Sequence, residues 1–255
     1  MKTLRFFLCA VSVFITATGM ARQNNHERND VLQYNRPAAH WLEALPLGNS
    51  HLGAMVYGGT DTEQIQLNEE TFWSGAPHDN NSLESKNYLQ QVRDSIFAGK
   101  EEVAADIINK HFLPGPHGMR FLTLGSVKLD FEDKGEVTGY SRNLKLYNAS
   151  VNVDYQRGGV TYHRQAFASM DDNVLVVRLW TDGSKTLSFK VGHECVFETR
   201  HAVEGDCLVA TIDGVEQEGI KAGLKAECRA KVTSNGKVTA DGEQLRVTDA
   251  SEAVI

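Results

Sequence analysis

His51 is surrounded by small residues in the segment "LPLGNSHLGAMVYGG", residues 45–59. The four glycines of this segment allow backbone conformations that other residues avoid, or let a second group approach closely. His51 follows a polar turn that contains Asn49, and it precedes Leu52–Tyr57, a compact apolar run that predicts a buried strand. Residues at the mouth of a strand often carry function, although more of them only form a turn. His51 and Asn49 are therefore candidate ligand-binding residues.

A second polar cluster follows closely in the stretch "QIQLNEETFWSGAPHDNN". An exposed Trp73 can stack on the apolar face of a sugar ring, while Asn68 and Glu69 bond its hydroxyl groups. The same pattern also fits a plain turn, in which Phe72 and Trp73 pack in the core and the two polar residues cap the turn. The sequence leaves both interpretations open, with Asn68, Glu69 and Trp73 as candidate sugar-binding residues.

Nothing in the chain predicts catalysis, a cofactor or a metal by itself. Glu69 and Glu70 are adjacent, so on a strand they point to opposite faces and form a poor acid and base pair for glycoside hydrolysis. The sequence has no nucleophile elbow, phosphate loop or dinucleotide fingerprint. Five histidines later in the chain lack metal-ligand spacing and are interpreted as surface or core residues: His111, His117, His163, His193 and His201.

Composition excludes one class of partner. The 255 residues carry a net charge of −7 and no basic stripe with interleaved aromatics, which argues against nucleic acid. Three cysteines follow the N-terminal segment: Cys195, Cys207 and Cys228. Because their number is odd and their spacing is not that of a zinc site, we expect buried free thiols rather than a disulfide framework.

The N-terminus "MKTLRFFLCAVSVFITATGMA" has basic residues, an apolar run and small residues, in the order of a secretory signal. It predicts a signal peptide over residues 1–21, removed after Ala21, and a domain over residues 22–255. We therefore expect a protein exported to a bacterial periplasm or outside the cell, without a membrane association after cleavage.

Most of the remaining chain predicts short strands. Runs such as "SVKLDFED", "VNVDYQRGGVTYHRQAF" and "NVLVVRLW" are separated by glycine-rich turns, which indicates a large antiparallel sandwich of the mainly β class. Two amphipathic helices interrupt it, the first ending at Gly99 and the second stopped by "PGP". We expect the second helix, "GKEEVAADIINKHF", to pack on the sandwich.

The last segment, "GEQLRVTDASEAVI", stops partway through an expected strand. A sandwich of this kind would expose an unpaired apolar edge, which is an aggregation liability. We therefore interpret the chain as the front portion of a longer protein.

The opening region resembles glycoside hydrolase family 95, the inverting α-L-fucosidases and related α-L-galactosidases. The resemblance rests on the motifs Trp-x-Glu-Ala-Leu-Pro-Leu-Gly-Asn, Leu-Gly-Ala-Met and Leu-Asn-Glu-Glu-Thr-x-Trp-Ser-Gly, in order and closely spaced between Trp41 and Gly75. Support continues through "YSRNLKLYNASVNVDY", "YHRQAFASMDDNVLVVRL" and "DASEAVI", so that the resemblance covers about residues 34–255.

The resemblance implies an N-terminal β-supersandwich whose catalytic machinery lies downstream, in an (α/α)6 barrel that this chain does not contain. It implies no catalytic role for any residue of the chain. The implied partners are that barrel in cis and, through the complete enzyme, a fucosylated or L-galactosylated oligosaccharide. In such a family the β-domain closes one side of the sugar pocket, so the resemblance strengthens the case that His51 reaches the sugar.

The chain departs from the family pattern at two positions. Ser50 stands where the family has the second glycine of a Gly-Asn-Gly turn, and Ser126 replaces an aspartate in "RFLTLGSVKL". Hydrogen bonds made by that aspartate are therefore in doubt. An alternative function, in another class, is a free-standing carbohydrate-binding or interaction module that uses Trp73 and neighbouring amides.

Overall fold

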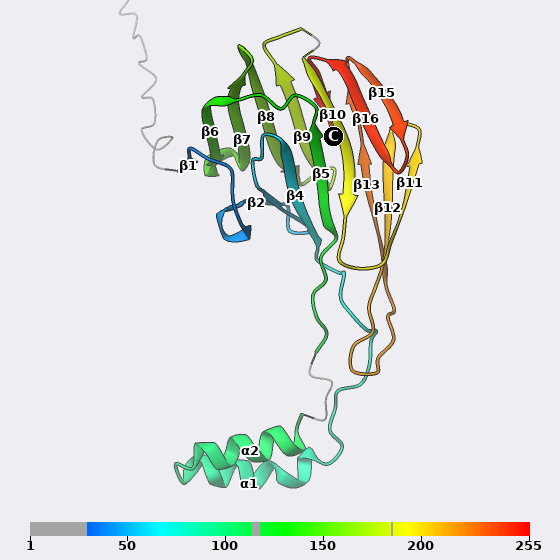
Figure 1. The fold of residues 1–255 in the computed structure, drawn as a ribbon. Coiled ribbons are helices and arrows are strands. Elements are labelled where there is room, and N and C mark those ends of the chain that lie inside the picture. The colour runs from blue at the N-terminus through cyan, green and yellow to red at the C-terminus, as the bar shows by residue number, and fades with distance from the viewer. Residues whose placement is uncertain (1–29, 114–117, 185) are drawn as a thin grey trace, which may run out of the picture.

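Two antiparallel sheets of seven strands face each other in this computed structural model, and a sheet of three strands packs beside the second (Figure 1). The structure describes residues 30–113, 118–184 and 186–255. The first sheet has, in spatial order, β1 (Val31–Tyr34), β6 (Val137–Lys145), β7 (Ser150–Arg157), β8 (Val160–Ser169), β9 (Val174–Thr181), β17 (Glu252–Val254) and β14 (Thr233–Ser234). The second has β15 (Lys237–Asp241), β16 (Gln244–Ala250), β10 (Leu187–Glu194), β5 (Gly125–Phe131), β4 (Thr62–Glu69), β3 (Leu52–Val56) and β2 (Leu45–Gly48). The small sheet has β11 (Thr199–Glu204), β12 (Cys207–Asp213) and β13 (Lys225–Lys231).

The core lies between the two large sheets and follows the alternation of the sequence. On β7, Val151, Val153 and Tyr155 are buried, and every second residue of β5 is buried opposite them. The β7–β8 hairpin turns at Gly158-Gly159, where both glycines have positive φ. The predicted mainly β antiparallel sandwich with a two-helix insertion is confirmed.

The two predicted helices are present as α1 (Ser85–Phe97) and α2 (Glu101–His111). Gly99 lies between them with a φ of +67°, a left-handed conformation that suits glycine at the end of a helix. Val92 and Ala104 are the buried residues of the pair. The helix boundaries thus agree with the sequence prediction.

The predicted packing of the second helix on the sandwich is wrong. The helices pack on each other, and Figure 1 shows them set apart from the sandwich at the end of an extended stalk. The stalk consists of the segment that leads from β4 to α1 and the described part of the segment that returns from α2 to β5. The rings of Tyr88 and His111 stack with centroids 3.5 Å apart, joining the two helices near the stalk. The stalk segments bond each other as extended chains, so they carry the helices away from the sheets instead of folding back.

The expected unpaired edge lies on β9 rather than on the C-terminal strand itself, because among the described strands β17 covers only the second half of that edge of β9. β17 lies between β9 and β14, and Ile255 exchanges both backbone hydrogen bonds with Val177, each at 2.9 Å. The chain crosses from β16 in the second sheet to β17 in the first, with Asp249 at a φ of +55° just before the crossing. The predicted signal peptide lies outside the described residues, and no helix within them has the length and apolarity to cross a membrane.

A buried ion pair joins the two large sheets. Glu63 on β4 contacts Arg164 on β8, and both side chains are almost fully buried. The Oε1 atom of Glu63 also accepts the backbone N–H groups of Tyr57 and Gly58, at 3.1 and 2.8 Å. Arg164 in turn donates to the carbonyl of Gly59 at 2.9 Å. The pair therefore fixes the turn between β3 and β4 as well as the distance between the sheets.

Two further buried arginines of the first sheet donate to backbone carbonyls, Arg157 at the same turn and Arg142 at the segment that precedes β2. Arg157 on β7 contacts Asp61 at 2.5 Å and donates to the carbonyl of Thr60 at 3.2 Å. Arg142 on β6 donates to the carbonyl of Glu43 at 2.9 Å. Buried guanidinium groups need such acceptors, because an uncompensated buried charge is costly.

Glu63→Gln should lower the free energy of unfolding by about 3–5 kcal/mol, because it leaves the Arg164 charge buried without its counter-ion. Adding Arg164→Met should recover much of that loss, since the amide still accepts from the turn. Urea denaturation of the single and double variants measures the coupling. As a matched control, Glu132→Gln breaks an exposed pair with Arg246 and should cost less than about 1 kcal/mol. Additive losses in the Glu63 and Arg164 variants would contradict the coupling.

A histidine pair joins the second sheet to the small sheet. His193 on β10 is buried, and its Nε2 lies 2.7 Å from the carbonyl of Leu124. That contact requires a proton on Nε2, so in neutral His193 the Nδ1 atom accepts a bond from Nε2 of His201, 3.2 Å away. His201 also faces Glu243 at 3.8 Å. Burial lowers the pKa of His193 below its ordinary value of 6.5, and nearby His201 adds to this.

The melting temperature should therefore fall as the pH drops below 6.5, because the unfolded chain takes up the proton that folded His193 resists. His193→Gln keeps a donor for Leu124 and should flatten this part of the profile between pH 7.5 and 5. His40→Gln, at an exposed histidine, is the control and should keep the wild-type slope. An unchanged slope in His193→Gln would show that another group dominates acid sensitivity.

Candidate functional site

The turn before β3 is held by one buried side chain. Asn49 is 4% exposed, and its Oδ1 atom accepts the backbone N–H groups of His51 and Leu52 at 3.2 and 2.7 Å. Its Nδ2 atom donates to the carbonyl of Ser169 at 2.7 Å and to Oδ1 of Asn173 at 2.9 Å. Both polar atoms of the Asn49 side chain are therefore bonded to other groups of the protein. Asn49 therefore shapes the turn, and its predicted contact with a ligand stays untested.

Ser50 adopts a φ of +75°, a conformation in which glycine is the usual residue. This explains the Gly-Asn-Gly pattern from which the sequence departs at Ser50. The turn keeps its shape with a serine because the Asn49 side chain bonds the backbone N–H groups of the two residues that follow Ser50. His51 follows directly, with its side chain 54% exposed.

His51 is oriented by the strand beside it. Its Nδ1 atom contacts Oε1 of Glu70, and its carbonyl accepts the backbone N–H of Glu70 at 3.0 Å. β3 and β4 pair Leu52 with Glu69, which brings the two segments together at this end of the hairpin. Because Nδ1 faces the carboxylate, Nε2 is the nitrogen that a ligand can reach. The exposed ring can donate to or accept from a hydroxyl group.

An exposed aromatic pair lies next to this contact. Trp73 is 44% exposed, and its indole N–H donates to the carbonyl of Glu70 at 2.8 Å. Its ring centroid is 5.1 Å from that of Phe121, which is 47% exposed. The indole nitrogen is already bonded, so the ring offers chiefly its apolar surface. Such a surface suits the apolar face of a pyranose. Glu70 thus links the two parts of the sugar-site cluster, His51–Glu70–Trp73–Phe121.

The other predicted residues follow the plain-turn interpretation. Glu69 accepts the backbone N–H and the hydroxyl of Thr71 at 2.9 and 2.7 Å, so it caps the turn. Asn68 donates to the carbonyl of Leu122 at 3.3 Å, and Phe72 is buried. The turn interpretation is confirmed for Glu69 and Phe72, whereas Asn68 bonds a distant carbonyl rather than its own turn and Trp73 is exposed instead of buried. Sugar contacts by Asn68 and Glu69 stay predictions.

The stalk fixes the position of the aromatic pair. Trp73 and Phe121 form an antiparallel bridge between the segment that leaves β4 and the segment that returns to β5. Hydrogen bonds join these two segments to the connection between β12 and β13, which contains Gln217. The side-chain oxygen of Gln217 accepts from Oγ of Ser74 at 2.6 Å and from the backbone N–H of Arg120. The same backbone N–H of Arg120 also donates to Oγ of Ser74. These hydrogen bonds therefore fix the part of the stalk that adjoins the sugar-site cluster.

Sequence reasoning misses Phe121 and the orienting role of Glu70. The sequence analysis considers Glu70 only as an unsuitable acid or base partner of Glu69, whereas in the structure it contacts a neighbouring histidine. Phe121 lies far from Trp73 in the chain, and only the antiparallel return after the two helices brings the two together. A hairpin-like return of the chain after a helical insertion is the signal that could have indicated this pairing.

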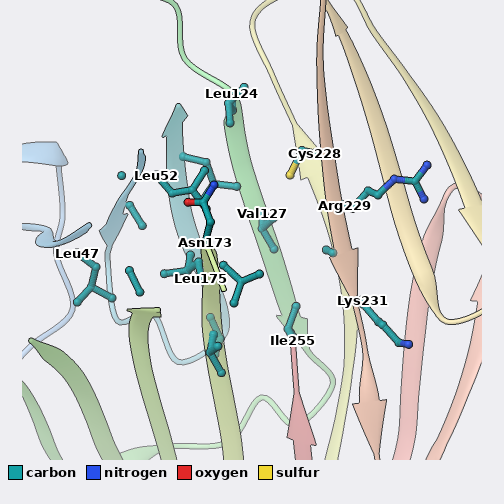
Figure 2. Close-up of a pocket in the computed structure, with 18 of the residues that line it drawn as sticks. Leu47, Leu52, Leu124, Val127, Asn173, Leu175, Cys228, Arg229, Lys231 and Ile255 are labelled. Carbon is teal, nitrogen blue, oxygen red and sulfur yellow. The ribbon is translucent and has the colours of Figure 1, made fainter. Parts of the chain in front are cut away.

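The two carboxylates of this region are both engaged by neighbouring side chains. The carboxylate of Glu69 is engaged by Thr71 and that of Glu70 by His51, so they do not converge on one bond. Among the residues that the structure describes, no group of three or more His, Cys, Asp or Glu side chains is arranged to hold a metal ion. A mostly apolar cavity of about 480 Å³ lies between the sheets nearby (Figure 2), and Asn68 is the predicted residue that lines it.

Comparison with known proteins identifies a family and several relatives of the chain. Residues 32–255 match the family model described as glycosyl hydrolase family 65, N-terminal domain. The chain is 31% identical over 166 residues to alpha-L-fucosidase 2 of Arabidopsis thaliana, covering 64% of this chain and 20% of that protein. It is 26% identical over 231 residues to the probable alpha-fucosidase A of Aspergillus oryzae, covering 84% of this chain and 31% of that one.

Among solved structures, a putative kojibiose phosphorylase from human microbiome aligns with a TM-score of 0.47 and 9% identity, over 88% of this chain and 31% of the other. A likeness of that size does not bear on function. The chain spans 20% and 31% of the two curated relatives described above.

The family match confirms the predicted N-terminal domain of a glycoside hydrolase, and the names of the curated relatives are consistent with the resemblance to family 95. The match covers nearly all the residues that form the two large sheets and the stalk. The chain belongs to the family of glycosyl hydrolase family 65 N-terminal domains.

Proposed function

We propose that the chain is the non-catalytic N-terminal domain of an exported α-L-fucosidase-like glycoside hydrolase. In this proposal the sugar-site cluster forms one wall of a pocket that a helical catalytic barrel completes in cis. The observation that carries the proposal is the exposed Trp73 beside the paired His51 and Glu70. The names of the curated relatives support a fucosylated glycan as the substrate.

The cluster suits a deoxy sugar in two ways. The Trp73–Phe121 surface can cover the apolar face of the ring and a methyl group, because neither ring nitrogen nor carboxylate interrupts it. His51 then provides one hydrogen bond to a ring hydroxyl through Nε2, with its orientation set by Glu70. General acid and water activation have to come from groups outside this chain.

Export is part of the proposal and rests on the order of charged, apolar and small residues over residues 1–21. The protein would then act in a bacterial periplasm or outside the cell, where fucosylated oligosaccharides are accessible.

A free-standing carbohydrate-binding module is the second candidate. The exposed Trp73 and Phe121 favour it, since the aromatic pair belongs to this chain alone. The two functions differ in what the isolated chain does. A module binds a fucosylated oligosaccharide unaided, whereas a pocket wall binds it tightly only together with the barrel.

The purified chain should show no hydrolysis of an aryl α-L-fucoside, because its carboxylates do not converge on one bond. Release of the aryl alcohol, followed by absorbance, is the measurement. Isothermal titration of the same sample with a fucosylated oligosaccharide distinguishes the two candidates. Micromolar binding by the chain alone would favour the module, and turnover abolished by a substitution within residues 30–255 would overturn both.

His51→Ala in the complete enzyme should lower kcat/KM about 10-fold or more, the effect of one lost hydrogen bond of roughly 1.4 kcal/mol. Its melting temperature should change little, since the side chain is largely exposed. Asn49→Ala is the matched control for the turn: it removes four hydrogen bonds of a buried side chain and should cost about 2 kcal/mol or more in stability. Unchanged kinetics with a lowered melting temperature in His51→Ala would mean that the residue only completes the turn.

A further inference from the structure

The outer face of the first sheet carries a row of side-chain amides. Strand pairing brings four of them into one line across β1, β6, β7 and β8, and we call them the amide row: Gln33, Asn143, Asn152 and Gln165. Residues alternate between the two faces of a strand, and Leu144 and Val153, which neighbour the row on β6 and β7, are packed in the core. The amides therefore lie on the opposite, outer face.

Hydrogen bonds hold three of these amides in a fixed order. Nε2 of Gln165 donates to Oδ1 of Asn152 at 3.0 Å, and Nδ2 of Asn152 donates to Oδ1 of Asn143 at 3.1 Å. Both polar atoms of Asn152 are thus used within the row. Among the hydrogen bonds of the described residues, none involves Nδ2 of Asn143 or Oε1 of Gln165. The row therefore offers a donor at one end and an acceptor at the other, which suits hydroxyl groups because each can both donate and accept.

The charged side chains next to the amide row are engaged with one another. Nδ1 of His163 lies 2.6 Å from Oδ1 of Asp154, and Nε of Arg178 lies 2.8 Å from Oε1 of Glu252. His163 also stacks on Trp180 with ring centroids 5.0 Å apart, and the guanidinium of Arg178 lies 4.8 Å from the same indole centroid. These charges already have partners, so the groups that the row leaves open to a ligand are neutral amides.

An exposed apolar ring borders the row on the other side. Phe167 lies two residues after Gln165 on β8, on the same face, and is 37% exposed. Its partner on β9 is Val176, so this part of the face is apolar. An exposed phenyl ring can cover the C–H face of a pyranose. Apolar surface beside neutral donors and acceptors is the combination that a neutral sugar requires.

The spacing of the row favours an extended ligand. Neighbouring strands of a sheet lie about 4.8 Å apart, which is close to the length of one hexose unit in an extended chain. The amide row crosses four strands, with one amide on each. A chain of β-1,4-linked glucose is extended and flat, so successive units can follow the row, whereas an α-1,4-linked chain curves away from a straight row.

We propose that the amide row and Phe167 form a binding site for one neutral, extended oligosaccharide that lies across the strands. Its hydroxyl groups bond Nδ2 of Asn143 and Oε1 of Gln165, while Asn152 positions both of these amides. Phe167 covers one ring of the ligand. The site lies on the first sheet, whereas the sugar-site cluster lies on the β3–β4 hairpin and the stalk, so this proposal does not rest on the proposed function.

The test titrates the nitrogen-15-labelled chain with cellopentaose, a β-1,4-linked glucose oligomer, and follows side-chain amide signals by nuclear magnetic resonance. The signals of Asn143 and Gln165 should shift and saturate, because their amide groups meet the ligand. Maltopentaose has the same number of glucose units in α-1,4 linkage and should bind about fivefold or more weakly, since its curved chain reaches fewer of the amides. No saturable shift with cellopentaose, or equal affinity for the two oligomers, would overturn the proposal.

Variants of exposed residues locate the binding. Gln165→Ala and Phe167→Ala should each weaken cellopentaose binding about fivefold or more in isothermal titration, with little change in melting temperature. Gln156→Ala is the matched control, because Gln156 is an exposed amide of β7 outside the row. It should keep the affinity of the unaltered chain, and so should His51→Ala, which separates this site from the sugar-site cluster. An equal loss in either control would contradict the assignment to the amide row.

Discussion

The contact between Glu63 and Arg164 is the constraint on which the rest of the structure depends. It crosses the core from the second sheet to the first, and the same carboxylate binds two backbone N–H groups of the β3–β4 turn. Arg157 and Arg142 reach the neighbouring backbone from the first sheet. A buried charge network tolerates little displacement, because each lost partner leaves an uncompensated group. One end of the β3–β4 hairpin is thereby fixed relative to both sheets.

The other end of that hairpin carries the sugar-site cluster. β3 has only five residues, so the turn held by the arginines and the turn that presents His51 are joined by one short, fully paired ladder. The hairpin therefore has two different ends. One end holds the buried charged side chains that stabilise the fold, and the other carries the exposed side chains of His51, Glu70 and Trp73. A site built on a rigid hairpin keeps its geometry without a large interface of its own.

Local periodicity in the sequence predicts the strands and helices correctly, but it fails where distant segments meet. Alternation places Val151, Val153 and Tyr155 inward, and Gly99 ends the first helix as predicted. Arg164 occupies an inward position of an alternating strand, but a charge there is read as solvent-exposed until its partner on another sheet is known. Phe121 joins Trp73 only through the return of the stalk, and the helices pack on each other because the stalk is extended. These arrangements depend on long-range contacts that periodicity does not encode.

The cavity between the sheets and the sugar-site cluster share one supporting side chain, Asn49. Asn173 and Leu52 line the cavity, and Asn49 bonds the side chain of the first and the backbone N–H of the second, at 2.9 and 2.7 Å. The same Asn49 oxygen accepts the backbone N–H of His51. The packing of Leu52 against the cavity and the turn that orients His51 therefore depend on the same buried side chain. Because protein interiors are densely packed, a change on the inner side of β3 shifts the position of the exposed His51 ring at its end.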